Sequence, residues 1–167
     1  HTEPAMSETA PFAEFRSDVL PEWVDHNGHM GIRSYTKVFD QAARLFYRHL
    51  GINRESLKSG NGSIFALQEA SWFRREVMLG DPLLVESQLI DCDHNKVVIF
   101  HTLIQTRDNY VAAKYEIIEI HIDMTTRKPA PFPASVQARL AEVMAQHAAL
   151  ERPVELGRGI AIPRKAG

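Results

Sequence analysis

The chain has one cysteine, Cys92, in 167 residues and no large excess of charge of either sign. A single cysteine excludes an internal disulfide framework and is typical of a reducing compartment, so we expect a cytoplasmic protein. The net charge of −2 argues against electrostatic binding of nucleic acid. No apolar run reaches the length of a membrane span, and the N-terminus lacks a signal-peptide core. We therefore expect neither nucleic acid nor membrane as a partner.

Apolar residues make up 44% of the chain, which is enough to form the core of one domain. Residues 1–11 are polar, and we expect them to form a flexible segment in which His1 could be a tag remnant. The main domain is expected over residues 12–133. A C-terminal helix over residues 134–150 and a basic, loose tail over residues 151–167 are expected to follow.

The spacing of apolar residues predicts one long amphipathic helix over residues 32–50, which ends at Gly51. Strand-like segments follow, separated by turn residues; they cover about 63–77, 82–92, 96–106 and 110–124. A bulge near Ile117 and Ile118 would explain a change of phase in the last segment. With a first strand before residue 25, these elements predict an α+β domain in which an antiparallel sheet packs on one helix.

A polar cluster precedes the long helix in the stretch PEWVDHNGHMGIRSY, residues 21–35. Five of these residues, DHNGH, bring together an acid, an amide and two histidines. A turn needs Asn27 and Gly28, but it does not need Asp25 and His29 as well. The cluster is either a turn with a helix cap, for which Asp and Asn are common, or a functional site.

This order of elements, with DHNGHM before the helix, resembles the hotdog-fold acyl-thioesterases over roughly residues 15–133. Many of them carry the run D-x-D-x-x-G-H-V-N-N-x-x-Y. The second Asp, the Gly, the His and the Tyr of that run are matched by Asp25, Gly28, His29 and Tyr35. Departures from the run are Trp23 in place of the first Asp, and Gly31-Ile32 in place of Asn-Asn.

A closer match in residue types is the D-x-N-x-H spacing of plant acyl-carrier-protein thioesterases, reproduced by Asp25, Asn27 and His29. The phrases PEWVDHNGHM, REVMLGDPL and RKPAPFP resemble betainyl-CoA thioesterases. These resemblances imply a hotdog fold, a curled antiparallel sheet around a central helix. They also imply a thioesterase that converts a small acyl-CoA to free acid and CoA. A homodimer or homotetramer with sites at the subunit interface is expected.

Thioester hydrolysis needs an attacking water or carboxylate and donors that stabilise the oxyanion. Under the resemblance, Asp25 is the base or nucleophile, His29 is its partner, and Asn27 holds the water or Asp25. The beginning of a helix offers unpaired N–H groups and a positive dipole end, and glycines allow close approach. The residues expected to meet the substrate there are Gly28, Met30, Gly31 and Ile32.

A second catalytic acid often comes from the strand after the helix in hotdog enzymes. Gln68 falls where relatives of the betainyl type have Glu, and Glu69 is its neighbour. Adjacent strand residues face opposite sides, so only one of them can face the cleft. The sequence leaves this choice open.

Two further groups of residues have two interpretations each. Four aromatic residues could form a cage for a trimethylammonium group, although core packing explains the same spacing. These are Trp23, Tyr35, Phe39 and Trp72. Four basic residues could bind the phosphates of CoA or form a solvated face. These are Arg74, Arg75, Arg127 and Lys128.

Two other functions stay open. Hotdog dehydratases and hydratases typically place Asp and His one residue further apart than Asp25 and His29. A non-catalytic acyl-CoA-binding module would keep the fold without the chemistry. No metal site and no organic cofactor are expected, because neither a closed ligand set nor a phosphate-binding glycine loop is present. The acyl group, and CoA or acyl carrier protein as its carrier, are not determined by the sequence.

Overall fold

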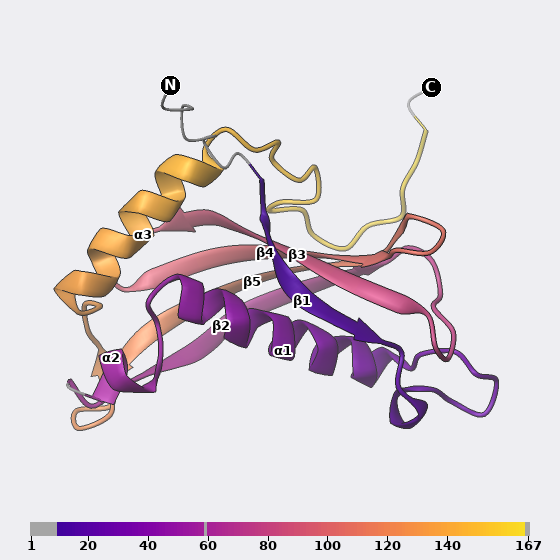
Figure 1. Ribbon diagram of the computed structural model, residues 1–167. Helices are drawn as coiled ribbons and strands as arrows, with labels where there is room; N and C mark the ends of the chain where they lie inside the picture. Colours follow the sequence, from indigo (N-terminus) through magenta and orange to yellow (C-terminus); the bar gives the residue numbers. More distant parts are fainter. Residues whose placement is uncertain (1–9, 59, 166–167) are drawn as a thin grey trace, which may run out of the picture.

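The computed structural model describes residues 10–58 and 60–165, which form one antiparallel sheet with its helices (Figure 1). The strands are β1 (Phe12–Asp18), β2 (Gly62–Phe73), β3 (Pro82–Cys92), β4 (Lys96–Gln105), β5 (Tyr110–Asp123) and β6 (Lys128–Pro129). The helices are the 3-10 turn η1 (Pro21–Trp23), α1 (Ile32–His49), α2 (Arg54–Lys58) and α3 (Ala134–His147). The long strands lie in the order β1-β3-β4-β5-β2, and the short β6 pairs with β5. β1 and β2 therefore form the edges of the sheet.

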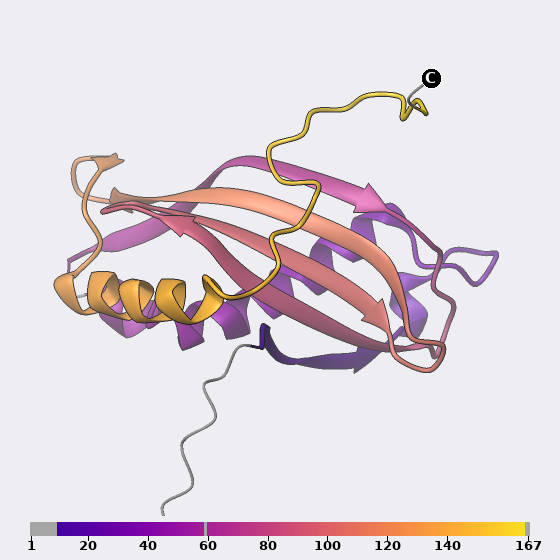
Figure 2. The same cartoon turned by 90° about the horizontal axis from the view of Figure 1, so that it is seen from above.

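The sheet curls around α1, which covers one face, while the C-terminal segment crosses the opposite face (Figures 1 and 2). We call these the inner face and the outer face. The apolar side chains of α1 recur every three or four residues, so they form one stripe that turns toward the inner face. The buried residues of this stripe are Tyr35, Val38, Phe39, Ala42 and Phe46. They meet buried side chains of β3, β4 and β5 in a single core.

The predicted long helix and the strands β3, β4 and β5 are confirmed to within a residue or two. β2 ends at Phe73, four residues earlier than predicted. The N–H groups of Arg74 and Arg75 both bond to the carbonyl of Ala112, so the chain leaves the ladder there. Part of the predicted loop after α1 forms the short helix α2. Across the described residues, no helix has the length and hydrophobicity needed to cross a membrane.

The predicted bulge near Ile117 and Ile118 is wrong in its position. On β5 those residues keep an unbroken register with β4. The irregularity lies on the neighbouring strand β2, where the pairing passes from Ala66 opposite Glu119 directly to Gln68 opposite Ile118. Leu67 is the extra residue. This bulge resets the alternation of β2, and it thereby decides which side chains of the strand face α1.

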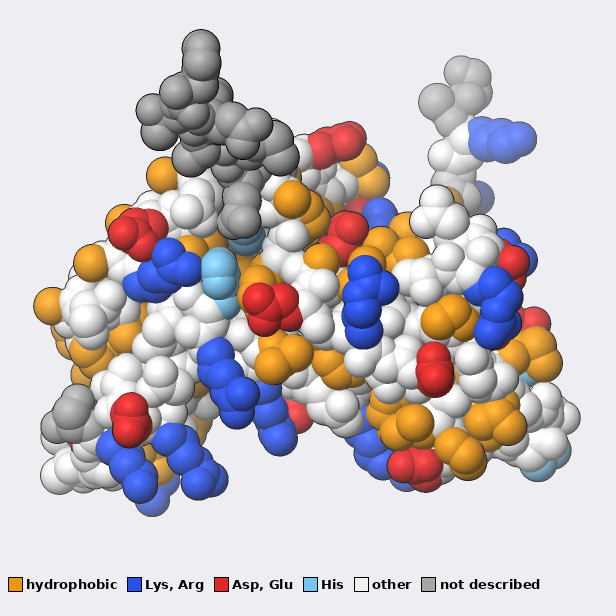
Figure 3. All heavy atoms as spheres, viewed as in Figure 1, with side chains coloured by type: hydrophobic (Ala, Val, Ile, Leu, Met, Phe, Trp, Pro, Cys, Tyr) orange, Lys and Arg blue, Asp and Glu red, His pale blue; other side chains and the backbone are white. Residues whose placement is uncertain are grey.

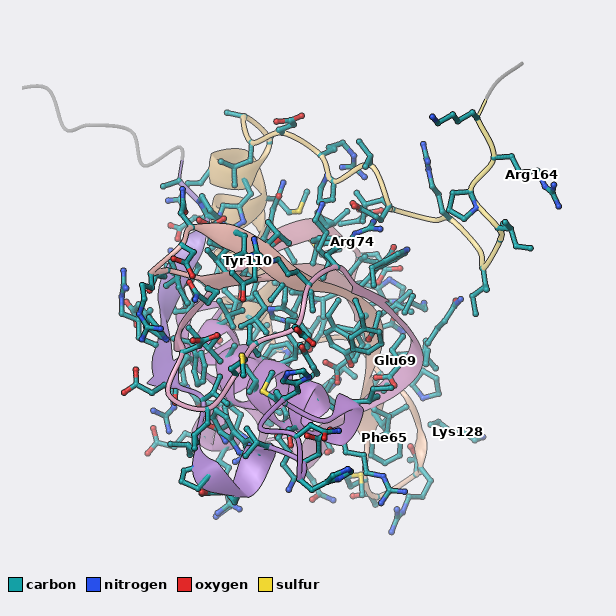
Figure 4. All side chains as sticks on the ribbon, turned by 90° about the vertical axis from the view of Figure 1, so that its right-hand side faces the viewer. Phe65, Glu69, Arg74, Tyr110, Lys128 and Arg164 are labelled. Atoms are coloured by element: carbon teal, nitrogen blue, oxygen red, sulfur yellow. The ribbon has the colours of Figure 1, made fainter. Side chains whose placement is uncertain are left out.

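The C-terminal tail was expected to be loose, but its first part is attached to the outer face. The carboxylate of Glu155 accepts hydrogen bonds from Arg74 at 3.0 Å and from Lys114 at 2.7 Å. Glu155 is only 5% exposed, whereas the side chains of its partners Arg74 and Lys114 are 48% and 23% exposed. Farther on, the tail turns away from the sheet, with Arg164 near its end (Figure 4).

Candidate active site

The DHNGH cluster forms a tight hairpin loop directly before α1. Val24 and Met30 pair across the base of the loop, and the N–H of Asp25 bonds to the carbonyl of His29 at 2.9 Å. Gly28 has a φ of 80°, a left-handed conformation that a residue with a side chain rarely adopts. The turn therefore requires a glycine at position 28, and the loop ends where the helix begins.

Asp25 is exposed, but the loop holds its carboxylate. Its Oδ1 accepts hydrogen bonds from the N–H groups of Asn27 at 2.9 Å and His29 at 3.2 Å. The bond from the Asn27 N–H, supported by that of His29, lowers the pKa of Asp25. The carboxylate is consequently ionised at neutral pH. This is the turn geometry that Asp commonly adopts, so Asp25 has a structural role here whatever its chemistry.

His29 is paired with a residue that the sequence analysis missed. Its Nδ1 lies 2.9 Å from Oε2 of Glu76, in the connection between β2 and β3. Backbone bonds fix this contact, because the N–H of Met30 donates to Val77 and the N–H of Leu79 donates to Gly28. Two loops distant in sequence are thus joined beside the start of α1. The spacing of residues gave no signal for Glu76, because its partner lies 47 positions away.

Helix α1 begins with its backbone open to a ligand. Gly31 is the N-cap residue, and no described side chain caps the helix. The first N–H groups of a helix have no partner within it, and they lie at the positive end of its dipole. Met30 is buried, whereas Ile32 is 69% exposed. Among the described residues, the N–H of Gly31 already donates to the carbonyl of Trp23, so the N–H groups of Ile32 and Arg33 are those that can serve a negatively charged oxygen.

The structure places Glu69 on the inner face and Gln68 on the outer face. Because of the bulge, Glu69 lies opposite the inward-facing Ile117, and its Oε2 accepts a hydrogen bond from Tyr115 at 2.5 Å. Gln68 lies opposite Ile118 on the other side of the sheet. The carboxylate, rather than the neutral amide, is thus available on the α1 side. Figure 4 shows Glu69 along β2 with Phe65.

The four aromatic residues considered as a cage do not come together. Trp23 and Tyr35 are buried in the core, and Tyr35 packs edge-on against Phe73. Trp72 lies on the outer face against Phe100, since its register partner is the outward Lys114. Phe39 stacks on another ring, that of Tyr115. Core and surface packing therefore explain these aromatic residues as a group.

Two of the four basic residues considered for phosphate binding have other partners. Arg74 bonds to Glu155, and the guanidinium of Arg75 lies 3.9 Å from the centre of the Tyr110 ring. Figure 4 shows Arg74 and Tyr110 at one end of the sheet, away from Glu69. In the part of the chain that the structure describes, no three His, Cys, Asp or Glu side chains gather as a metal site would require.

A cavity of about 420 Å³ lies between α1 and the inner face of strands β5 and β2. We call it the inner pocket. Its lining residues are Arg33, Thr36, Lys37, Phe39, Asp40, Ala43, Arg44, Tyr47, Ala66, Tyr115, Ile117 and Glu119. The hydroxyl of Tyr47 donates a hydrogen bond to Glu119 across the pocket. The sequence analysis placed Tyr115 and Glu119 correctly on a strand but gave neither a role.

Comparison with known proteins identifies the family. Residues 19–140 match the model of the Thioesterase-like superfamily, which is most of the chain. The chain belongs to this family. Over 149 residues it is 32% identical to a betainyl-CoA thioesterase of Pseudomonas aeruginosa, a match that covers 89% of this chain and 94% of that protein.

Solved structures agree with this assignment. A Staphylococcus aureus protein solved in complex with CoA superposes with a TM-score of 0.84 at 28% identity, covering 92% of this chain and 96% of that one. A proposed thioesterase of Pseudomonas putida KT2440 gives a TM-score of 0.78 at 25% identity, covering 92% and 98%. The fold is the hotdog fold, and the chain is an acyl-CoA thioesterase, as the sequence predicted.

Proposed function

We propose that this thioesterase hydrolyses a short acyl-CoA at the N-terminal end of α1, with Asp25 as the reacting carboxylate. The observation that carries the proposal is the position of the DHNGH loop directly before open helical N–H groups. Asp25 is ionised at neutral pH, and only its Oδ1 is used within the loop, among the described residues. Oδ2 is then the oxygen that attacks the carbonyl or orients a water.

The pairing of His29 with Glu76 supports a role for His29 in the reaction. An imidazole that donates from Nδ1 to a carboxylate carries its acceptor on Nε2. Such a ring is held in one tautomer and one orientation, as in other hydrolytic sites. The N–H groups of Ile32 and Arg33 would stabilise the oxyanion, an effect typically worth about 2.7–4 kcal/mol per donor. Asn27 would hold the water.

We further propose that the enzyme acts as a homodimer joined at β2. β2 pairs with β5 on one side only, and its other edge is open among the described residues. Large apolar side chains are exposed along it, with Phe65 44%, Leu67 55% and Phe73 49% accessible. A second copy that extends the sheet across this edge would cover them. Glu69 would then lie at the subunit boundary as a second carboxylate.

For the acyl group, we propose a short chain of the betainyl type carried on CoA. The 32% identical relative is a betainyl-CoA thioesterase, and a similar structure was solved in complex with CoA. The phrases that first suggested this type, around Asp25 and around Gly80, fall inside the matched region. A small substrate also agrees with the modest size of the inner pocket.

The test is release of CoA thiol from a panel of acyl-CoAs, from acetyl and betainyl to long-chain and aromatic, by the wild type and Asp25→Asn. We expect hydrolysis of short acyl groups and a loss of about 100-fold or more in kcat for the variant. Asp93→Asn is the matched control, because Asp93 also holds a turn through its Oδ1 but lies at the β3–β4 connection. Equal activity of Asp25→Asn and wild type on every hydrolysed substrate would reject the role of Asp25.

A further inference from the structure

A broad groove lies at the end of the molecule where α1 ends and β2 begins. It has a volume of about 960 Å³ and is bounded by the last turns of α1, the helix α2 and residues 62–64. Four of its lining residues are basic, namely Arg44, Arg48, Arg54 and Lys58. Figure 3 shows Lys and Arg side chains gathered at this end of the molecule, at the lower left of the view. We call this surface the basic groove.

Most of the positive charge of the basic groove has no counter-charge. Arg44 is paired with an aspartate one turn earlier in α1. The side chains of Arg48, Arg54 and Lys58 are exposed, and none of them forms an ion pair within the part of the chain that the structure describes. Two acids also line the groove, Glu55 and Glu119. Three unpaired cations exceed these two acids, so the groove suits a ligand with several negative charges.

Within one chain, the basic groove is far from the DHNGH loop. The loop lies beside the end of β2, because Phe73 packs edge-on against Tyr35 near the start of α1. The groove lies beside the beginning of β2, at Gly62. β2 has 12 residues, so at roughly 3.3 Å per residue its two ends are about 36 Å apart. Figure 1 shows α2 and the start of α1 at opposite ends of the sheet.

The dimer proposed above reverses this relation. Edge strands that pair about a two-fold axis perpendicular to the sheet run antiparallel, as all paired strands of this chain do. The beginning of one β2 then lies beside the end of the other. The basic groove of each subunit is thereby brought next to the DHNGH loop of its partner, on the same face of the joined sheet.

Acyl-CoA has the shape and the charge for such an arrangement. The long pantetheine arm separates its thioester from its phosphates, so reaction and phosphate binding require two separate places on the protein. Guanidinium and ammonium groups bind phosphates through charged hydrogen bonds. Arg33 and Lys37 are exposed along the first two turns of α1 and extend the positive surface between the two places. Arg74 and Arg75 lie nearer the loop in the chain but already have other partners.

From these observations we propose that the phosphates of CoA bind across the dimer, on Arg48, Arg54 and Lys58 of the partner subunit. The thioester of the same molecule lies at the start of α1 in the first subunit. The proposal rests on the site and the dimer proposed above, and it adds the residues that hold the carrier. Each complete site is then built from two chains, with the DHNGH loop from one and the basic groove from the other.

The first experiment compares thioesters with and without the phosphates. Acyl-CoA and the matching acyl-pantetheine carry the same reacting group, which is the acyl group that the wild type hydrolyses fastest. For the double variant Arg54→Gln/Lys58→Gln we expect the KM of acyl-CoA to rise about tenfold with little change in kcat, because charged bonds to the phosphates are lost. The KM of acyl-pantetheine should stay the same. Arg16→Gln is the matched control, since Arg16 is exposed on β1 at the opposite edge of the sheet.

A mixed dimer tests whether the groove acts across the interface. One chain carries Asp25→Asn, the other carries Arg54→Gln/Lys58→Gln, and two different affinity tags allow the mixed species to be purified. If the groove serves the partner, one of the two sites has an intact loop and an intact groove. We then expect the wild-type KM and about half of the wild-type kcat. If each groove serves its own chain, neither site is intact, and the high KM of the groove variant remains.

The outcomes separate this proposal from the proposed function. A wild-type KM for acyl-CoA in the groove variant, or a high KM in the mixed dimer, overturns binding across the dimer and leaves the Asp25 site in place. Full activity of Asp25→Asn overturns the catalytic assignment instead, while a rise in KM confined to acyl-CoA still supports the groove as the phosphate site. A fully active monomer at the assay concentration overturns both the dimer and this proposal.

Discussion

Two glutamates with little exposure lie on opposite faces of the same sheet, and their surroundings differ. Glu155 on the outer face accepts bonds from Arg74 and Lys114, and these bonds outweigh the effect of burial and lower its pKa. Glu119 on the inner face has one tyrosine as its partner, and burial raises its pKa. Among the described residues, the first carboxylate is compensated by two cations, whereas the second has no cationic partner.

The comparison shows how a structural carboxylate differs from one that is available to a ligand. A protein that needs a charge only for stability provides its counter-charge nearby, as the outer face does. A carboxylate left with an uncompensated charge lowers stability unless something else binds to it. Such perturbed groups occur mainly at functional sites, although structural networks can also produce them. The inner face also carries the start of α1 and the DHNGH loop.

The largest effect is expected from Phe39→Ala, which removes the ring that forms the wall of the inner pocket and part of the core. Phe39 is 1% exposed and stacks on Tyr115. Loss of a buried phenylalanine typically lowers the free energy of unfolding by about 3–5 kcal/mol. Urea unfolding should show this decrease, and Val154→Ala, at a side chain that is 64% exposed and lies away from the β2 edge, should change it by less than about 1 kcal/mol. Similar decreases in both variants would show that Phe39 is not packed as described.

The next largest effect is a loss of folding stability at acid pH, because a buried histidine on the inner face is neutral in the folded protein. His101 is completely buried beside the rings of Phe39 and Tyr115, and its Nδ1 lies 2.7 Å from the hydroxyl of Ser87. Burial lowers the pKa of His101 from 6.5 to about 3. As the pH falls, His101 is therefore protonated at a higher pH in the unfolded chain than in the folded protein. Stability from this group is complete above pH 6.5 and decreases as the pH falls toward 3.

Unfolding measured from pH 7.5 to pH 4 should show this decrease, on the order of a few kcal/mol at most. The slope should be smaller in His101→Gln, which has no proton to bind. His94→Gln is the control, since His94 is exposed in the β3–β4 connection. An unchanged slope in His101→Gln would assign the acid sensitivity to other groups, such as His147, whose pKa burial also lowers.

The sequence predicted the elements well but not the contacts between them. Period 3.6 and period 2 patterns are local, so α1 and the strands β3 to β5 could be read directly. The bulge at Leu67 could not be located, because a register shift depends on both strands of a pair. The choice between Gln68 and Glu69 depends on that bulge.

The site was predictable where its residues are neighbours in sequence, and not where they are distant. Asp25, Asn27 and His29 form one loop, and the structure keeps them together at the start of α1. The pairs His29–Glu76 and Tyr47–Glu119 join separate elements, and no spacing rule connects them. Attachment of the tail by Glu155 was missed for the same reason.

The smallest effect tests the two glutamates directly with one substitution at each. Glu155→Gln removes a charge that two cations compensate, so we expect the free energy of unfolding to fall by about 1–2 kcal/mol, because Arg74 remains partly exposed. Glu119→Gln removes an uncompensated charge and keeps an acceptor for Tyr47, so stability should stay the same or rise slightly. Chemical denaturation at pH 7.5 measures both. Hydrolysis by Glu155→Gln should match the wild type, since Glu155 lies on the outer face. A stability loss in Glu119→Gln equal to that in Glu155→Gln would mean that Glu119 is a structural residue like Glu155, with its charge compensated in the folded protein.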